Sequence, residues 1–515
     1  MSRSIRLVSA AGVVLTLAVA SGCSGGSGVN VGGAGSSNGG STSGGVLQAA
    51  IGGEPDQLDP QKTSAYYSFE VLENVYDTLV QPDANLNMQP ALATSWDTSK
   101  DQLTWTFHLG KGLSFSDGSP LTSKDVVYSF ERIIKDKLNS SYKFTTVKSI
   151  TAPDPATVVF TLSAPTPNML ANVGGFKGVG IVEQSNVDSG KIKTAPVGSG
   201  PFMVKSYVSG DKIELVPNPH YWGPKPKLAG VTYTFVKDPT VALQDLQSGQ
   251  VQWTDNLPPQ QVASLKNNSD ISVQSAPSTD YWYMALNETH KPFDNPQVRR
   301  AVAFALDREA ITKAATFGNA TVNQTAIPKG SQWYFEYAPY THDPAKAQQL
   351  MGQAGVKNAS MDLMVTSQYP ETVRAAQVIA SELGAIGINV KIRTLDFAQW
   401  LDEEGKGNFD SFMLGWLGNL DPDEFYYAQH HSGANFNFQK YSNPSVDKLL
   451  DQARTETDQK ARKQEYDQAA KMIVDDASYI YLYNPDVVQG WSKKVSGYQV
   501  RSDRAIRFGQ TSLTQ

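Results

Sequence analysis

The clearest pattern along the chain is a repeated order of an amphipathic helix, a glycine and an apolar strand. In DPAKAQQLMGQAGVKNASMDLMV, Asp343 stands where a helix N-cap is expected, Pro344 follows at the first helical position, and Gly355 ends the helix before the strand. The same order begins at Asp238 and again at Glu371, where a strand with alternating apolar residues follows. Repeated units of this kind with short connections predict an α/β fold.

One region has a different pattern, in which a predicted strand, a turn and a helix follow one another closely. Apolar residues alternate over 103–109 and predict a strand with one apolar face, and a turn is expected at Asp117 and Gly118. Thr122 and Asp125 have the spacing of a capping box, which predicts that a helix begins there. The apolar face of that helix consists of Val126, Phe130 and Ile133. The pattern indicates an αβ insertion.

The first residues have the layout of a secretory signal peptide. Arg3 and Arg6 precede an apolar run over residues 7–20, which is too short to span a membrane comfortably, and small residues lead up to Cys23. We expect residues 1–22 to be a signal peptide that is removed; a short N-terminal anchor helix is the alternative interpretation. The prediction places the mature protein outside the cytoplasm.

Cys23 is the only cysteine in the chain. Its context, ASGC at the end of the signal peptide, resembles a bacterial lipobox, in which the cysteine is acylated and becomes the first residue of the mature chain. A Gly/Ser-rich segment follows, so residues 23–45 are interpreted as a lipidated cysteine with a flexible tether. We therefore expect an extracytoplasmic protein that a lipid anchor alone holds to the outer face of the bacterial cell membrane.

Charge and composition narrow the class of partner. The net charge is −6, and removal of Arg3 and Arg6 leaves 42 basic against 50 acidic residues, or −8. A mixed, mildly acidic surface argues against nucleic acid as a partner. After Val46 no apolar run approaches membrane-spanning length, and this part is long enough for two or three domains. The 22 tyrosines and 9 tryptophans are suitable for lining a cleft.

Residues that could support metal or nucleophilic chemistry are sparse. The six histidines include the adjacent His430 and His431, but neighbours on a helix point about 100° apart, so we expect no metal site there and no cofactor. Ser140 and Lys143 match the S-x-x-K spacing of penicillin-recognising enzymes, yet the accompanying K-T-G strand is missing, with only KTA at Lys193. An exported serine hydrolase is the remote alternative, and we expect a protein that is not an enzyme.

A series of segments after Val46 stands in an order that matches one protein family. The segments are IGGEPDQLDP (51–60), VLENVYDTLV (71–80), PALATSWD (90–97), FSDGSPLTSKDVVYSFER (115–132), PVGSGPF (196–202), NPHYWGPKP (218–226), NPQVRRAVAFALDREAI (295–311), GWLGNLDP (415–422) and YSNPSVDKLLDQAR (441–454). Together they resemble the large extracytoplasmic solute-binding proteins of family 5, which deliver peptides, and sometimes nickel or oligosaccharides, to ABC importers. The resemblance covers essentially the whole chain after the tether.

The resemblance implies a two-lobed α/β fold of the periplasmic-binding-protein type, with a hinge between the lobes and the solute enclosed between them. Lobe one is expected over residues 46–278 and 487–515, with an extra subdomain inserted at about 78–189. Lobe two is expected over 279–486. The αβ insertion falls within the inserted subdomain. Closure around a solute is the signal that the permease subunits of an importer would read, and we expect a monomer.

The resemblance also implies site residues, and the chain departs from the dipeptide-binding pattern at two of them. In dipeptide- and oligopeptide-binding members, the residue three after Trp416 is an aspartate that pairs with the peptide α-ammonium; here it is Asn419. An arginine that holds the ligand carboxylate corresponds to Gln368, with Tyr369 beside it. An amide cannot neutralise a charge, and a buried charge without a partner is costly. Asp421 is expected to cap the following helix, or in part to replace the missing aspartate.

Aromatic residues complete the expected lining. Trp416 and Tyr369 are expected to line the cleft. Trp282 and Tyr283, at the crossover into lobe two, are expected near the cleft or in the core, and Tyr66 and Tyr67 are further candidates on lobe one. The sequence thus predicts a substrate-binding lipoprotein of an ABC importer. It would capture peptides that are longer than dipeptides or lack free charged termini, and deliver them to the membrane permease. An oligosaccharide or a nickel chelate is the alternative solute.

Overall fold

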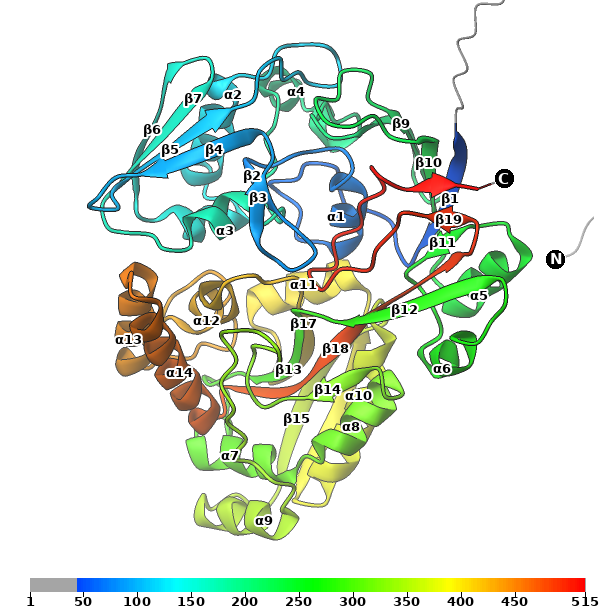
Figure 1. Cartoon of the computed structure of the whole chain (residues 1–515). Coiled ribbons are helices and arrows are strands. Elements are labelled where there is room, and N and C mark those ends of the chain that lie inside the picture. The colour runs from blue at the N-terminus through cyan, green and yellow to red at the C-terminus, as the bar shows by residue number, and fades with distance from the viewer. Residues whose placement is uncertain (1–43, 515) are drawn as a thin grey trace, which may run out of the picture. The chain divides into compact units, whose positions relative to one another are not determined.

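The fold is described from a computed structural model, which covers residues 44–514. The signal peptide, Cys23 and most of the tether lie outside the described residues, so the targeting and lipidation predictions stay predictions. Helices and strands alternate along the described chain, as Figure 1 shows, and the predicted α/β class is confirmed.

A 12-stranded sheet forms the centre of the fold. Its strands are β1 (Gly44–Ile51), β8 (Phe202–Val208), β9 (Lys212–Pro217), β10 (Leu228–Phe235), β11 (Trp253–Thr254), β12 (Ile271–Pro277), β13 (Tyr281–Leu286), β14 (Ala320–Val322), β15 (Ala359–Thr366), β16 (Ile388–Leu395), β17 (Ser411–Trp416) and β18 (Tyr479–Ser492). The order is β16-β15-β17-β13-β18-β11-β1-β10-β9-β8, with β12 and β14 paired to β18. Parallel pairs such as β15 and β16 follow from the helix that connects them.

The long strand β18 connects two parts of this sheet. Its first residues, from Tyr479 to Tyr483, pair with β13, and its later residues, from Asp486 to Ser492, pair with β12. Buried apolar residues form separate clusters in the two parts. One cluster draws its members from residues 281–483, and the other from 47–253 and 487–508. We call the part around the first cluster lobe two and the rest of the described chain lobe one.

A second, four-stranded sheet lies in lobe one, in the order β4-β5-β7-β6. The strands of this sheet are β4 (Ala93–Thr98), β5 (Thr104–Leu109), β6 (Val147–Asp154) and β7 (Thr157–Leu162). The same part of the chain also forms β2 (Val80–Pro82), β3 (Met88–Pro90), α2 (Ser123–Lys135), α3 (Met169–Gly174) and α4 (Gln184–Asp188). Phe107 and Leu109 of β5 are buried in the same cluster as the apolar face of α2. The predicted capping box is present, because Asp125 accepts a hydrogen bond from the backbone N–H of Thr122 at 2.8 Å.

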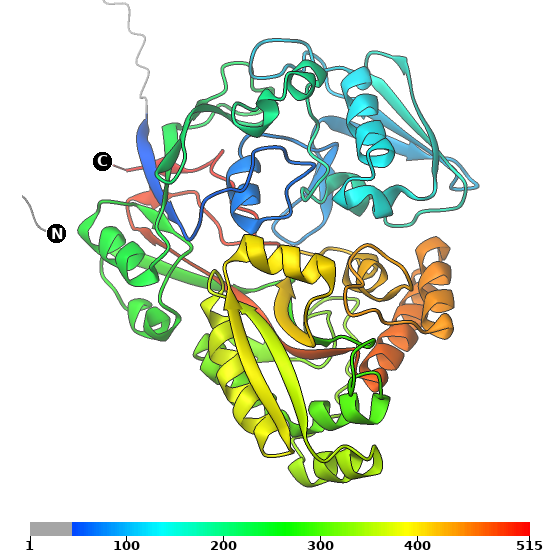
Figure 2. The same ribbon diagram turned by 180° about the vertical axis from the view of Figure 1, so that it is seen from behind.

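The predicted helix–glycine–strand units are confirmed. The helices of these units are α5 (Pro239–Ser248), α9 (Pro344–Gln353) and α10 (Pro370–Gly384). A further helix, α11 (Phe397–Lys406), follows β16. Asp238 caps α5 and Asp343 caps α9, while Gly249 ends α5 with a φ of 79°. Figure 2 shows α10 and α11 beside the paired strands β15 and β16, all in yellow tones. These boundaries depend on groups within a few residues of each other, which is why the pattern predicted them.

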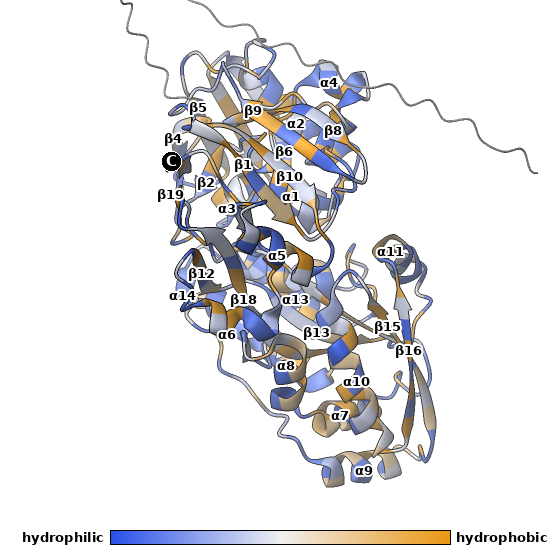
Figure 3. Ribbon diagram, turned by 90° about the vertical axis from the view of Figure 1, so that its right-hand side faces the viewer, coloured by the Kyte–Doolittle hydropathy of each residue, from blue (hydrophilic) through white to orange (hydrophobic). Residues whose placement is uncertain are grey.

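The remaining helices pack around the sheets. They are α1 (Tyr66–Leu72), η1 (Asn139–Phe144), η2 (Lys191–Lys193), η3 (Pro259–Gln261), α6 (Val262–Leu265), α7 (Pro296–Ala305), α8 (Arg308–Thr316), α12 (Pro422–His430), α13 (Pro444–Thr455) and α14 (Gln459–Asp476). Figure 3 shows polar and apolar residues interleaved along helices such as α7, α8 and α10. Within residues 44–514, no helix combines the length and apolar character needed to cross a bilayer.

Candidate functional site

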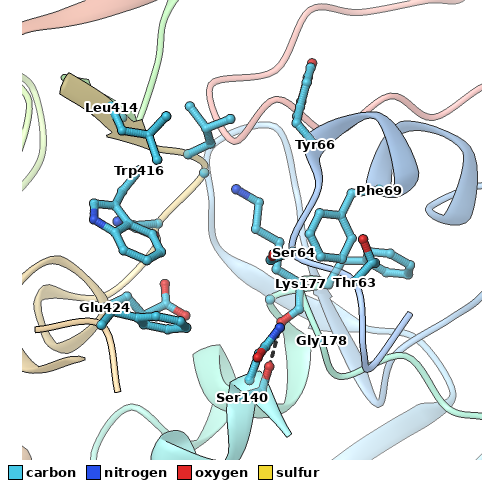
Figure 4. A pocket seen from close by; sticks show the side chains of 18 of the residues that line it. Thr63, Ser64, Tyr66, Phe69, Ser140, Lys177, Gly178, Leu414, Trp416 and Glu424 are labelled. Atoms are coloured by element: carbon cyan, nitrogen blue, oxygen red, sulfur yellow. Dashed lines mark hydrogen bonds between the residues drawn. The ribbon is translucent and has the colours of Figure 1, made fainter. Parts of the chain in front are cut away.

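Residues of both lobes line a cavity of about 330 Å³, which Figure 4 shows from close by. Lobe one contributes Tyr66 and Phe69 from α1, and Lys177 from the loop that follows α3. The wall on lobe two includes Trp282, Tyr369, Phe397, Leu414, Trp416 and Asn419. We call this space the first cavity. Its size and its largely aromatic lining are typical of a small-solute site.

The end of β17 and the start of α12 form one wall of the first cavity. Trp416 is the last residue of β17, and Asn419 lies in the turn before α12. Gly418 in this turn has a φ of 62°, and its N–H donates to Oδ1 of Asp280 at 2.6 Å. Asp421 then caps α12 by accepting a backbone N–H at 3.0 Å. The turn is therefore held at both ends, with Trp416 and Asn419 toward the cavity.

Trp282 reaches the cavity because its partner on the neighbouring strand is a glycine. Trp282 of β13 lies opposite Gly415 of β17, and a Cβ at Gly415 would lie 2.8 Å from the indole ring. Tyr369 packs edge-on against Trp282 with 5.7 Å between the ring centroids, and Phe397 lies 5.4 Å from Tyr369. This row of rings offers faces and edges to peptide side chains or to sugar rings alike.

A second cavity, of about 580 Å³, adjoins the first, since Trp282 and Phe397 line both. Tyr67 and Gln368 also line the second cavity. Of the two uncharged residues that replace charged ones of the dipeptide-binding pattern, Asn419 therefore lies in the first cavity and Gln368 in the second. A solute that contacts both residues must extend past the aromatic row.

Two residues that the sequence indicated lie away from both cavities. Tyr283 is fully buried and stacks on Tyr479 with 3.8 Å between the ring centroids. Because side chains alternate along β13, Trp282 and Tyr283 face opposite sides of the strand. Both carboxylate oxygens of Asp421 accept hydrogen bonds from Arg462, at 2.6 and 2.8 Å. These positions favour the core interpretation for Tyr283 and the capping interpretation for Asp421, both of which the sequence left open.

Lys177 is a cavity residue that the sequence analysis missed. Its side chain points into the first cavity in Figure 4. The feature of the sequence that could have identified it is a single lysine among glycines and apolar residues, in GGFKGVG. Ser140 Oγ donates to the Lys177 carbonyl at 3.2 Å and holds the loop. Burial lowers the pKa of Lys177 to about 8, against the opposing effect of Asp280 and other carboxylates, so most of this ammonium stays protonated at pH 7.

Most other charges on the wall of the first cavity are paired or neutralised. Lys143 of lobe one forms a buried ion pair with Glu424 of lobe two. Arg507 lies 3.4 Å from Glu73, and burial raises the pKa of Glu73 to about 7 although Arg507 opposes this. Burial also raises the pKa of Glu404 well above its usual range, which favours its uncharged form.

The residues considered for enzyme or metal chemistry are hydrogen-bonded, ion-paired or buried. Ser140 donates its hydroxyl to a backbone carbonyl, and the ion pair of Lys143 with Glu424 leaves no free base beside it. His430 is buried, which lowers its pKa to about 3. Over residues 44–514, no group of three or more histidine, cysteine, aspartate or glutamate residues is placed to hold a metal ion.

A two-lobed α/β fold with a solute-sized cavity lined by both lobes defines the class of periplasmic binding proteins. Comparison with known proteins agrees. The profile of the bacterial extracellular solute-binding proteins, family 5 Middle, matches residues 87–437. The probable D,D-dipeptide-binding periplasmic protein DdpA of Escherichia coli (strain K12) is 32% identical over 461 residues, which cover 86% of this chain and 89% of that protein.

Solved structures of the same class superimpose on the fold. The periplasmic binding protein DppA from Helicobacter pylori, in complex with the peptide STSA, matches with a TM-score of 0.85 and 30% identity, over 92% of this chain and 98% of that chain. AgaA from A. tumefaciens R10, in complex with agropinic acid, matches with a TM-score of 0.84 and 28% identity, over 92% and 99%. The chain therefore belongs to the bacterial extracellular solute-binding proteins of family 5.

Proposed function

We propose that this protein is the substrate-binding lipoprotein of an ABC importer and that its solute is a peptide. The peptide would be enclosed between the lobes and delivered to the permease subunits in the membrane, without chemical change. The observation that carries the proposal is the pair of adjoining cavities with a shared aromatic row, the first of them lined by both lobes. The peptide STSA in the related DppA of Helicobacter pylori supports it.

The lining suggests what kind of peptide fits. The proposed aromatic contacts are Trp416, Tyr369, Trp282, Tyr66 and Tyr67. Asn419 and Gln368 bring hydrogen-bonding groups but no charge. A free ammonium at Asn419, or a free carboxylate at Gln368, would lose its hydration without gaining an opposite charge from that residue. Peptides longer than dipeptides, or peptides without free charged termini, therefore suit the site best.

We also propose that the two chain segments that connect the lobes, near residues 278 and 486, act as a hinge. This places lobe one at residues 46–278 and 487–515, with the subdomain at about 78–189, and lobe two at 279–486. The N–H of Ser278 donates to the carbonyl of Pro485 at 3.2 Å, so the two segments lie side by side. Closure requires only that the peptide bind the closed form more tightly than the open one.

The anchor and the assembly belong to the same proposal. Acylation of Cys23 would tether a monomeric receptor to the outer face of the cell membrane, where the permease subunits are its partners. The lipobox-like context of Cys23 and the Gly/Ser-rich segment after it support this.

Native mass spectrometry of the full chain, purified in detergent from cells, tests the proposed solute. We expect bound masses that fragment into amino-acid residues, with lengths above two residues. Masses spaced by hexose units, or a bound nickel chelate, would contradict the peptide assignment. If the protein is purified without solute, a thermal-shift screen with tri- to hexapeptides decides, and no stabilisation by any of them contradicts the proposal.

A further inference from the structure

We propose that the first cavity contains a subsite for an anionic group of the solute, a carboxylate, held between Lys177 of lobe one and Asn419 of lobe two. The inference rests on the proposed function and refines it, because it states the charge of the group that the solute places at this wall. It concerns one end of the cavity only and leaves the aromatic row to the rest of the solute.

Lys177 reaches across the first cavity. Its Nζ lies 2.6 Å from the position that a Cβ on Gly418 would occupy, so the ammonium stands against the turn that carries Asn419. Figure 4 shows the same side chain extended into the space between the two walls. Lys177 forms no ion pair with any residue in the range 44–514, and its hydrogens therefore remain available to a solute.

The charges around Lys177 do not cancel it. The ion pairs on this wall are Lys143 with Glu424, Arg507 with Glu73, and Arg501 with Asp503. Asp280 attracts Lys177 most strongly, but Asp280 itself forms an ion pair with Arg504. Glu404 is the remaining acidic residue of the lining, and burial favours its uncharged form. Within the described structure, the first cavity therefore carries one positive charge in excess, which favours an anion.

Asn419 adds a second donor on the opposite wall. Its Nδ2 is buried and has no hydrogen-bond partner among residues 44–514. A buried donor without a partner costs about 1–3 kcal/mol, and a solute oxygen would remove this cost. A carboxylate has two acceptor oxygens and can accept from Asn419 and Lys177 together. An ammonium group would instead meet a like charge and accept nothing, so the wall discriminates against it.

The position of the two donors links the subsite to closure. Lys177 belongs to lobe one and Asn419 to lobe two, so a carboxylate that contacts both is bound fully only when the lobes are together. Such a solute has a higher affinity for the closed form and shifts the equilibrium toward it. A solute with the same aromatic contacts but an amide in place of the carboxylate would close the protein less well.

Three tetrapeptide libraries, incubated with the full chain and read by native mass spectrometry, test the subsite. The first lacks aspartate and glutamate and has free C-terminal carboxylates; the second is its C-terminal amide. The third is amidated and contains one glutamate in each peptide. We expect at least tenfold enrichment of an acidic library over the uncharged amide library. Enrichment of the first assigns the carboxylate to the peptide terminus, and enrichment of the third to a side chain. Equal binding of all three overturns the proposal.

Matched variants show whether Lys177 causes the preference. In Lys177→Gln, the enrichment of the acidic library is expected to fall at least tenfold. Lys177→Arg keeps the positive charge and should retain most of the enrichment. Lys111→Gln removes an exposed lysine away from the cavities and should bind like the wild type. An enrichment that survives in Lys177→Gln overturns the proposal even if the wild type prefers acidic peptides.

Absence of binding by every library would contradict the peptide function. The subsite is then tested separately with small dicarboxylic acids. Thermal shifts with glutarate and with its uncharged diamide, glutaramide, compare the two charges at one size. Stabilisation by glutarate that Lys177→Gln abolishes upholds the subsite without a peptide. Equal effects of glutarate and glutaramide on the wild type overturn it.

Discussion

Between β17 and α12, some side chains face the first cavity and others that are close in sequence form buried contacts within lobe two. Trp416 faces the first cavity and packs against Phe436 with 4.9 Å between the ring centroids. Asp421, five positions later, turns away from the cavity and pairs with the buried Arg462. Because the two roles are carried by different contacts, substitutions at these residues should affect different measurements.

Trp416→Ala should raise the dissociation constant of the peptide identified by native mass spectrometry at least tenfold, which corresponds to about 1.4 kcal/mol. The substitution removes an aromatic face that the solute would cover, while the strand that carries it keeps its pairing with β13. Isothermal titration calorimetry measures the constant, and thermal unfolding should stay cooperative. Trp96→Ala in β4 is the control, since Trp96 lies outside both cavities. An unchanged constant would remove Trp416 from the site.

Asp421→Ala should lower the free energy of unfolding by about 3–5 kcal/mol, because it leaves the guanidinium of Arg462 buried without its partner. It also removes the N-cap of α12. Asp343→Ala is the matched control, because Asp343 caps α9 at the surface through a backbone N–H at 2.9 Å, and it should cost only about 1 kcal/mol. Urea denaturation measures both. Equal losses would show that the ion pair adds nothing to the cap.

Among the secondary-structure elements, the pairing of β13 with β17 builds the aromatic row. The register sets Trp282 opposite Gly415, and the missing side chain of the glycine leaves room for the indole. The start of α10 then brings Tyr369 against the same indole. One glycine therefore positions rings that come from two different elements.

Gly415→Ala should weaken peptide binding about tenfold and cost about 1–3 kcal/mol of stability, because the new Cβ displaces Trp282 from its place in the row. Gly352→Ala in α9 is the control: a Cβ there has no neighbour within 4 Å, so helix propensity alone should stabilise the protein by about 0.5–1 kcal/mol. Calorimetric titration and urea denaturation of both variants give the comparison. Wild-type affinity in Gly415→Ala would mean that the indole adapts without affecting the site.

Across the whole molecule, a few direct contacts between side chains and backbone join the two lobes. Lys143 and Glu424 form their ion pair across the first cavity. Arg454 of α13 donates to the backbone carbonyl of Tyr142 at 2.5 Å, close to the same place. These contacts link the subdomain of lobe one to α12 and α13 of lobe two, and they stabilise the arrangement in which the cavity is enclosed.

Glu424→Gln should shift the solute-free protein toward an open form, because it leaves Lys143 buried without an opposite charge. We expect a larger radius of gyration by small-angle X-ray scattering and a peptide affinity that falls at least fivefold. Glu131→Gln is the control, since it breaks only an exposed ion pair with Lys135 within one helix. An unchanged radius together with unchanged affinity would show that the ion pair does not link closure to binding.

The sequence by itself determined the α/β class, the helix starts at Asp238, Asp343 and Asp421, and the capping box of α2. These features were predictable because a cap, a turn or an alternating strand depends on groups within a few residues of each other. The motif order also indicated the family, and with it the aromatic residues Trp282 and Trp416 that line the first cavity.

Only the tertiary structure decided which residues share a cavity. It separated Trp282 from Tyr283, joined Asp421 to Arg462, and brought Lys177 beside the turn of Asn419. The physical reason is sequence distance: Lys143 and Glu424 are 281 positions apart, and no local pattern specifies such a partner. The groups that surround the charge of Lys177 belong in part to the other lobe, and only the packing of the whole fold brings them beside it.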